Sequence, residues 1–161
     1  MNCQSRQLND ADRLIRHCPK RFEDGGVFSA EAFWFSNSDL KKDNPYLSFN
    51  WLEKICQDAQ IPTNPKSALD ELQCNFPHDI KKGEWWLILS CERIRAAIRR
   101  VPNCCPSILH CPDCQNPSHA AVSGYEKPLY KTVAAELLIE LESQPNNIYP
   151  VTKTVKKNRK S

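Results

Sequence analysis

The chain has 161 residues, of which 40% are hydrophobic and 25% charged, so it can bury one hydrophobic core and is short for two. The net charge is +3, but five basic residues follow residue 150 and the rest is slightly acidic, which excludes the broad positive surface of a nucleic-acid-binding domain. No run of about 18 apolar residues occurs and no apolar segment opens the chain, so we expect no membrane span and no secretion, and predict a cytoplasmic protein.

The first third of the chain predicts short elements joined by turns. Leu14 and Ile15 stand among charged residues before Pro19, which limits the extent of any strand there. Glycines tolerate the positive φ of tight turns, and Gly25 and Gly26 indicate one. The expected elements are a strand over 12–18, a turn at 23–26, a buried strand or short helix over 27–35, a polar loop over 36–44 and a brief strand over 47–49.

Two helices are predicted next from capping residues and apolar spacing. Asn50 stands three residues before Glu53, as in a capping box, so we expect Asn50 to be the N-cap of a helix that runs to about residue 59. After a proline-containing linker, Ser67 is the expected N-cap of a second short helix, which Pro77 ends.

The most apolar segments lie in the second half of the chain. Residues 85–89 (WWLIL) predict a central strand, and Ser90 is the expected N-cap of a following helix that Pro102 stops. In that helix the arginines, Arg95 included, are expected on a solvated face, with a phosphate-contacting surface as the alternative. Residues 129–141 carry the apolar stripe of an amphipathic helix, and we expect this stripe to meet 85–89 in the core.

Together these elements predict an α+β fold, with a small mixed sheet packed by three to four helices. We expect residues 1–149 to form a single domain. The basic segment 150–161 has little to bury and predicts a disordered tail.

Nine cysteines are an odd number, and in a reducing cytosol free thiols or metal ligands are expected before disulfides. Cys111 and Cys114 form a C-x-x-C pair, whose spacing lets two thiolates bind one zinc ion. The local candidates for the remaining ligands are Cys104, Cys105, His119 and His110. The alternatives are reduced cysteines that pack as small apolar residues, and redox use of the C-x-x-C pair.

Histidine and arginine side chains supply the candidate catalytic groups. His119 begins a predicted strand, 119–123, after a turn, where it can act as a general base, bind a metal or be purely structural. His17 can form an anion-binding or acid–base cluster with Arg13 and Arg16 if the first strand lies beside that one. Ser29 and Ser48 are considered as nucleophiles, although no glycine-flanked elbow surrounds either of them.

Several short motifs, spread over residues 12–141, are shared with one group of proteins. They are residues 12–16 (DRLIR), Gly26 with Ser29 and Phe33, residues 47–48 (LS) and residues 116–120 (NPSHA). In these motifs the chain resembles a family of small, mostly uncharacterised bacterial proteins. The resemblance implies no established activity, but it singles out Arg16, Ser29, Ser48 and His119 as polar residues to test together.

Three hypotheses for function follow. The first is a non-catalytic accessory or protein-interaction module of a bacterial multi-gene system, such as a defence or conflict system, because the sequence has no phosphate loop, paired-carboxylate motif or nucleophile elbow. The second is a small enzyme in which His119 is the acid–base group and Arg16 binds an anionic phosphodiester or nucleotide substrate. The third is a zinc-stabilised nucleic-acid-binding protein.

The basic C-terminal tail is the part of the sequence that suggests binding partners. Its charges can attract nucleic acid or an acidic protein through a salt-sensitive contact, or can simply keep the chain soluble. The residues concerned are Lys153, Lys156, Lys157, Arg159 and Lys160.

Overall fold

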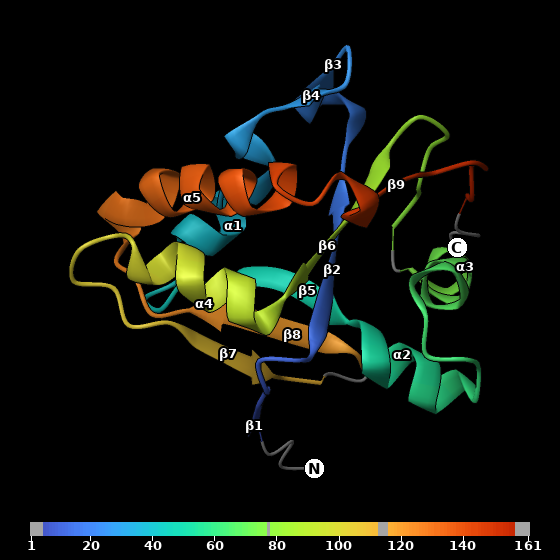
Figure 1. Cartoon of the computed structure of the whole chain (residues 1–161), viewed down its shortest axis with the longest axis horizontal. Coiled ribbons are helices and arrows are strands. Elements are labelled where there is room, and N and C mark those ends of the chain that lie inside the picture. Colours follow the sequence, from blue (N-terminus) through green and yellow to red (C-terminus); the bar gives the residue numbers. More distant parts are fainter. Residues whose placement is uncertain (1–4, 77, 113–115, 157–161) are drawn as a thin grey trace.

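The computed structural model describes residues 5–76, 78–112 and 116–156, and a seven-stranded sheet runs through it in the order β1-β7-β8-β5-β2-β6-β9 (Figure 1). Every pairing between described strands is antiparallel rather than of mixed direction. A separate two-stranded hairpin, β3–β4, extends away from the body beyond α5 (Figure 1). The strands are β1 (Arg6–Gln7), β2 (Arg13–Cys18), β3 (Glu23–Asp24), β4 (Val27–Phe28), β5 (Leu47–Trp51), β6 (Trp85–Ser90), β7 (Ser107–His110), β8 (His119–Ser123) and β9 (Ile148–Pro150).

Helices cover both faces of the sheet, and the fold is of the predicted α+β class. The α-helices are α1 (Asn37–Leu40), α2 (Leu52–Ala59), α3 (Pro65–Asn75), α4 (Cys91–Arg99) and α5 (Tyr130–Glu142). The 3-10 helices are η1 (Lys20–Phe22), η2 (Ala30–Phe33), η3 (Lys127–Leu129) and η4 (Pro145–Asn147). One apolar cluster lies under α4 and α5, and a second lies under α2 and α3. Within the described part of the chain, no helix combines the length and apolar composition needed to cross a bilayer.

The strand β6 belongs to both clusters, which explains its uninterrupted apolar sequence. Leu87 and Leu89 pack with Val133 and Leu137 of α5, while Trp86, on the other face, packs under α2 and α3. Successive side chains of a strand point to opposite faces, so a strand buried on both faces has apolar residues at each position. The predicted meeting of 85–89 with the stripe of 129–141 is confirmed.

The capping residues of two helices differ from those predicted. Asn50 is not an N-cap, because β5 continues through Trp51, which pairs with Leu14 of β2, and α2 begins at Leu52. The N-cap of α3 is Asn64, whose side chain accepts a 2.9 Å hydrogen bond from the amide of Ser67. The prediction for Ser90 is confirmed, since its side chain accepts from the amide of Arg93 at the start of α4.

Arg95 lies in the interior rather than on a solvated face. It is 8% exposed, donates to the carbonyl of Leu8 and forms an ion pair with Asp10. Its guanidinium therefore attaches the N-terminal segment to α4, a contact that helical periodicity does not predict.

The structure describes three further segments in more detail than the sequence does. The loop over 36–44 contains the short helix α1, which Ser36 and Asp39 begin with a capping box. The β7–β8 hairpin lies inside the sheet between β1 and β5. The segment over 27–35 forms β4 and η2, and Phe33 within it is buried as predicted.

Residues 150–156 take part in the fold, although they belong to the segment expected to be a disordered tail. The strand β9 pairs with β6, and the next residue, Val151, is 2% exposed and packs in the cluster under α2 and α3. Val155 and Ile80 exchange backbone hydrogen bonds of 2.9 and 3.0 Å. Lys157, Arg159 and Lys160 lie outside the described residues.

Candidate functional site

The candidate site is a cleft at the point where two neighbouring strands stop pairing. The strand β2 pairs with β6 along all of Arg13–Cys18, but it pairs with β5 only at Leu14 and Ile15. A cleft of about 860 Å³ is lined there by residues of both strands, together with η2, α1, and loop residues before β8. The site is therefore a product of the sheet topology.

Arg16 lies at this divergence and links the separated elements. Its Nε donates to the carbonyl of Ala32 at 2.6 Å, Nη1 to the carbonyl of Ser48 at 2.7 Å and Nη2 to the carbonyl of Trp34 at 3.4 Å. Carbonyl dipoles satisfy N–H groups but do not cancel the charge, and no described carboxylate forms an ion pair with this guanidinium. Burial lowers the pKa of Arg16 to about 10, so the side chain still carries a positive charge at neutral pH.

A guanidinium has five N–H donors, and these three hydrogen bonds leave two of them for a ligand. The ring of Phe49 lies 5.7 Å from the guanidinium carbon and restricts its position further. Arg16 thus presents a fixed positive charge in the cleft wall.

His119 and Ser48 meet across the pairing of β5 with β8. The Nδ1 atom of His119 is 3.0 Å from the carbonyl oxygen of Cys111, and Nε2 is 3.4 Å from the hydroxyl oxygen of Ser48. A carbonyl oxygen can only accept, so Nδ1 carries the proton of the neutral ring and Nε2 has a free lone pair. This lone pair is directed at a serine hydroxyl, the arrangement of a general base beside a nucleophile.

A buried polar network holds the turn that leads into β8. Asn50 is 6% exposed, and its Oδ1 accepts from Nδ2 of Asn116 at 2.9 Å and from the hydroxyl of Ser118 at 3.3 Å. The amide of Trp51 donates to the carbonyl of Ser118 at 2.7 Å. These bonds fix the residue before His119 against β5, a role that sequence reasoning missed by treating Asn50 as a helix cap. The available signal was a polar residue inside the apolar strand sequence LSFNW.

His17 lines the same cleft, but its side chain is already engaged. Its Nε2 atom is 2.9 Å from a carboxylate oxygen of Glu84, and the rings of Phe76 and Trp86 lie 5.5 and 5.2 Å away. Burial lowers the pKa of His17 and outweighs the opposing effect of the Glu84 hydrogen bond and charge. Arg16, His17 and His119 all line the cleft. The predicted cluster required the first strand to lie beside 119–123, but β5 separates β2 from β8, and Arg13 pairs with Glu53 instead.

Ser29 is a predicted candidate that the structure does not bring into the site. It is exposed, is not among the described residues that line the cleft, and its hydroxyl accepts from the amide of Glu31 at 3.2 Å. Ser29 is therefore the N-cap of η2.

The predicted zinc ligands do not converge within the described residues. The amide of Cys105 bonds to Gly124 at one end of the β7–β8 hairpin, and that of Cys111 bonds to His119 at the other. The four residues of β7 between them span roughly 13 Å, whereas two thiolates on one zinc ion each lie about 2.3 Å from it. Cys104 adjoins Cys105 and is separated from Cys111 in the same way.

His110, another local candidate, is buried with its Nε2 atom 2.7 Å from the carbonyl oxygen of Pro117 and its ring against Trp51. Among the described residues no group of three or more His, Cys, Asp or Glu side chains is placed to hold a metal ion. Cys114 lies outside the described residues, so zinc bound by Cys111 and Cys114 stays a prediction. Burial raises the pKa of the Cys111 thiol, which disfavours the thiolate that redox use of the pair needs.

Comparisons of this chain with protein families, with curated proteins and with solved structures find no match. The resemblance to a bacterial family stays a prediction, and the functional argument below depends on the geometry of the cleft.

Proposed function

We propose that this chain is a small enzyme in which His119 is the acid–base group and the cleft at the β2–β5 divergence binds an anionic substrate of the phosphodiester or nucleotide class. The observation that carries the proposal is the position of His119. Its Nδ1 proton is committed to the carbonyl of Cys111, so Nε2 is left as a base on the side of Ser48.

The charge of Arg16 supports an anionic substrate. Buried cations are usually neutralised by a carboxylate, whereas Arg16 is held by three carbonyl oxygens and keeps two N–H donors. Asp39 also lines the cleft, but its carboxylate is paired with Lys42 at 2.7 Å. Guanidinium groups bind phosphate oxygens through paired, charge-assisted hydrogen bonds, which suits a substrate with two non-bridging oxygens.

The aromatic side chains of the cleft support a nucleotide over a simple phosphate ester. The half-buried rings of Trp34 and Phe76 contribute to the lining, and planar bases stack on such rings with a free energy of about 1–3 kcal/mol per base. A cleft of about 860 Å³ is large enough for a nucleotide.

The test is hydrolysis of a panel of phosphodiesters, from bis(p-nitrophenyl) phosphate to dinucleotides and cyclic nucleotides, by purified protein. His119→Ala is expected to lower kcat/KM by about 10²- to 10⁴-fold, the range of general acid–base catalysis. The matched control is His78→Ala, an exposed histidine that also lines the cleft, for which we expect a change of less than about threefold. Equal activity of the two variants, or no hydrolysis and no calorimetric binding across the panel, would overturn the proposal.

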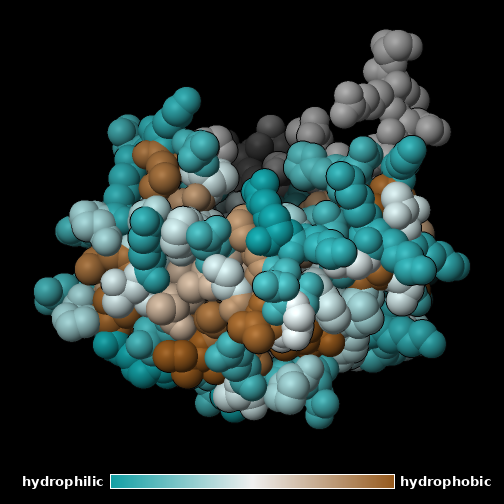
Figure 2. Space-filling model, turned by 90° about the horizontal axis from the view of Figure 1, so that it is seen from above, coloured by the Kyte–Doolittle hydropathy of each residue, from teal (hydrophilic) through white to brown (hydrophobic). Residues whose placement is uncertain are grey.

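A second candidate, the non-catalytic interaction module, is favoured by exposed apolar side chains. Val27 of the β3–β4 hairpin is 67% exposed and Ile139 of α5 is 55% exposed. In the space-filling view, brown apolar atoms gather at the lower and left parts of a mainly hydrophilic face (Figure 2). Loss of a captured protein partner on Val27→Asp, with activity unchanged, would support this function.

The third candidate, a zinc-stabilised nucleic-acid-binding protein, also stays a prediction. It requires bound zinc in elemental analysis of the purified protein and salt-dependent binding of nucleic acid through the basic C-terminal residues. Absence of zinc from protein prepared without chelators would remove it.

A further inference from the structure

Ser48 is fixed on both sides of its strand. Its carbonyl accepts the Arg16 hydrogen bond at the β2 side of β5, and at the β8 side it pairs with Ala121. The side chain lines the cleft and is half-buried. Only the side-chain torsion therefore determines where the Ser48 hydroxyl lies. The hydroxyl oxygen is 3.4 Å from Nε2 of His119.

The other candidate serines of this region have hydroxyls used elsewhere. The Ser118 hydroxyl lies 3.0 Å from Oδ1 of Asn116 and 3.3 Å from Oδ1 of Asn50, so its one proton is used within the buried network. Ser29 is the cap of η2. Among the described hydrogen bonds between side chains, the serine hydroxyl that meets an imidazole nitrogen is that of Ser48.

We propose that Ser48 is the nucleophile of this cleft and forms a covalent phosphoseryl intermediate, an inference that rests on the proposed phosphodiesterase function. In the first step the Ser48 Oγ–phosphorus bond forms and the bond from phosphorus to the leaving alkoxide breaks. The hydroxyl proton passes to Nε2 of His119 and then to that alkoxide, which departs as an alcohol.

The second step restores the enzyme with one water molecule. Water attacks phosphorus while Nε2 of His119 accepts its proton, the phosphorus–Oγ bond breaks, and Ser48 recovers the proton from His119. The product is a phosphate monoester. No oxidant, reductant or further reactant is required.

The charge of Arg16 fits this chemistry because it lies beside the peptide unit of the attacking residue. Negative charge develops on the non-bridging phosphate oxygens as the Oγ–phosphorus bond forms, and a fixed cation lining the same cleft stabilises that charge without reorganisation. The alternative role of the Ser48–His119 contact is a simple cross-strand hydrogen bond, which makes no covalent adduct.

The experiment is reaction with a fluorophosphonate, which transfers phosphorus to an activated serine with loss of fluoride, followed by intact-mass and peptide analysis. We expect the wild-type chain to gain one adduct on Ser48, and Ser48→Ala and His119→Ala each to slow labelling by at least about 100-fold. Ser29→Ala is the matched control and should label at the wild-type rate. Urea unfolding of each variant verifies that the fold is retained.

Hydrolysis of the phosphodiester panel separates this inference from the function on which it rests. Inactive Ser48→Ala together with inactive His119→Ala supports both. If Ser48→Ala hydrolyses substrate at the wild-type rate, or if the adduct forms on another residue, the nucleophile is not Ser48 while the acid–base role of His119 stands. If neither variant changes turnover, both proposals fail.

Discussion

The guanidinium of Arg16 donates a 2.7 Å hydrogen bond to the main-chain carbonyl of Ser48, across the point where β2 and β5 cease to pair. A side chain here replaces the backbone ladder that the two strands would otherwise continue. The same guanidinium also holds η2 through the carbonyl of Ala32. One residue thus connects the two strands and the segment that together form the cleft.

Arg16→Met is expected to lower the free energy of unfolding by about 2–4 kcal/mol, because it leaves partly buried carbonyls without donors. Arg16→Lys should lower the free energy of unfolding less, since an ammonium group can donate to one or two of these carbonyls. Urea denaturation provides the measurement. Arg21→Met, which removes an exposed arginine at the same cleft, is the control and should cost less than about 1 kcal/mol. Comparable losses at Arg16 and Arg21 would contradict the linking role.

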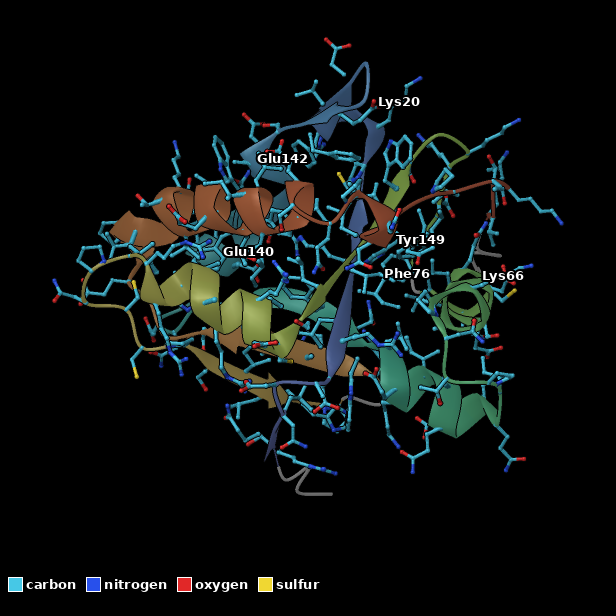
Figure 3. The ribbon with its side chains drawn as sticks, in the orientation of Figure 1. Lys20, Lys66, Phe76, Glu140, Glu142 and Tyr149 are labelled. Atoms are coloured by element: carbon cyan, nitrogen blue, oxygen red, sulfur yellow. The ribbon has the colours of Figure 1, made fainter. Side chains whose placement is uncertain are left out.

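Glu140 of α5 is expected to contribute more to stability than its neighbour Glu142. Its side chain, labelled in Figure 3, is 12% exposed and accepts from Arg93 at 2.9 Å and from Arg100 at 2.6 Å. Arg93 belongs to α4, and Arg100 is the residue that ends it. Burial opposes ionisation, but the two arginine hydrogen bonds outweigh it and lower the pKa of Glu140. Glu140→Gln should therefore lower the free energy of unfolding by about 1–2 kcal/mol. The value is small for two ion pairs because both arginines are more than a third exposed, and solvent screens their charge.

The control for Glu140 is Glu142→Gln, which changes an exposed side chain and should alter stability by less than about 0.5 kcal/mol. Thermal or urea unfolding at low and high salt measures both. The loss of stability caused by Glu140→Gln should depend less on salt than the loss caused by removing an exposed ion pair. Equal effects of the two substitutions would show that the α4–α5 ion pairs contribute nothing.

The stability of the fold should decline as the pH falls below about 6.5, partly through His17. Burial lowers the pKa of His17 from 6.5, and its charged neighbours are Glu84, which raises that pKa, and Arg16 and His78, which lower it. Because the unfolded chain takes up the proton more readily, this contribution is fully present above pH 6.5 and is lost through lower pH. His17→Gln should flatten the decline in the free energy of unfolding between pH 7 and 5.

The matched variant for this measurement is His78→Gln, which removes an exposed histidine near the same cleft and should keep the wild-type slope. A slope of stability against pH that is unchanged in His17→Gln would mean that other groups cause the acid sensitivity.

Two truncations test how much residues 151–156 contribute to stability. Ending the chain after residue 150 removes Val151, which is 2% exposed and whose amide bonds to the carbonyl of Glu84 at 2.8 Å, as well as the pairing of Val155 with Ile80. We expect a loss of about 2–4 kcal/mol in the free energy of unfolding. Ending the chain after residue 156 should cost less than about 0.5 kcal/mol. If the two truncated chains have similar free energies of unfolding, residues 151–156 contribute nothing to stability, as expected of a disordered tail.

The sequence predicted those features that depend on residues close together in the chain. The apolar run of β6, the stripe of α5, and the N-cap at Ser90 each follow from local spacing, because side-chain periodicity and capping involve neighbours within a few residues. From these patterns follow the α+β class and the contact between β6 and α5. His119 as the start of a strand after a turn was predicted for the same reason.

Only the tertiary structure determined which distant residues meet. Asn50 forms a hydrogen bond with Ser118, 68 residues away, and Arg95 with Asp10, 85 residues away. Local patterns instead predicted Asn50 as a helix cap and Arg95 as a solvent-exposed residue. Likewise, Arg16 and His119 line one cleft because β5 pairs with β8 along its length and leaves β2 after two residues. Strand order and the point of divergence depend on the packing of the whole chain, and no short segment of sequence encodes them.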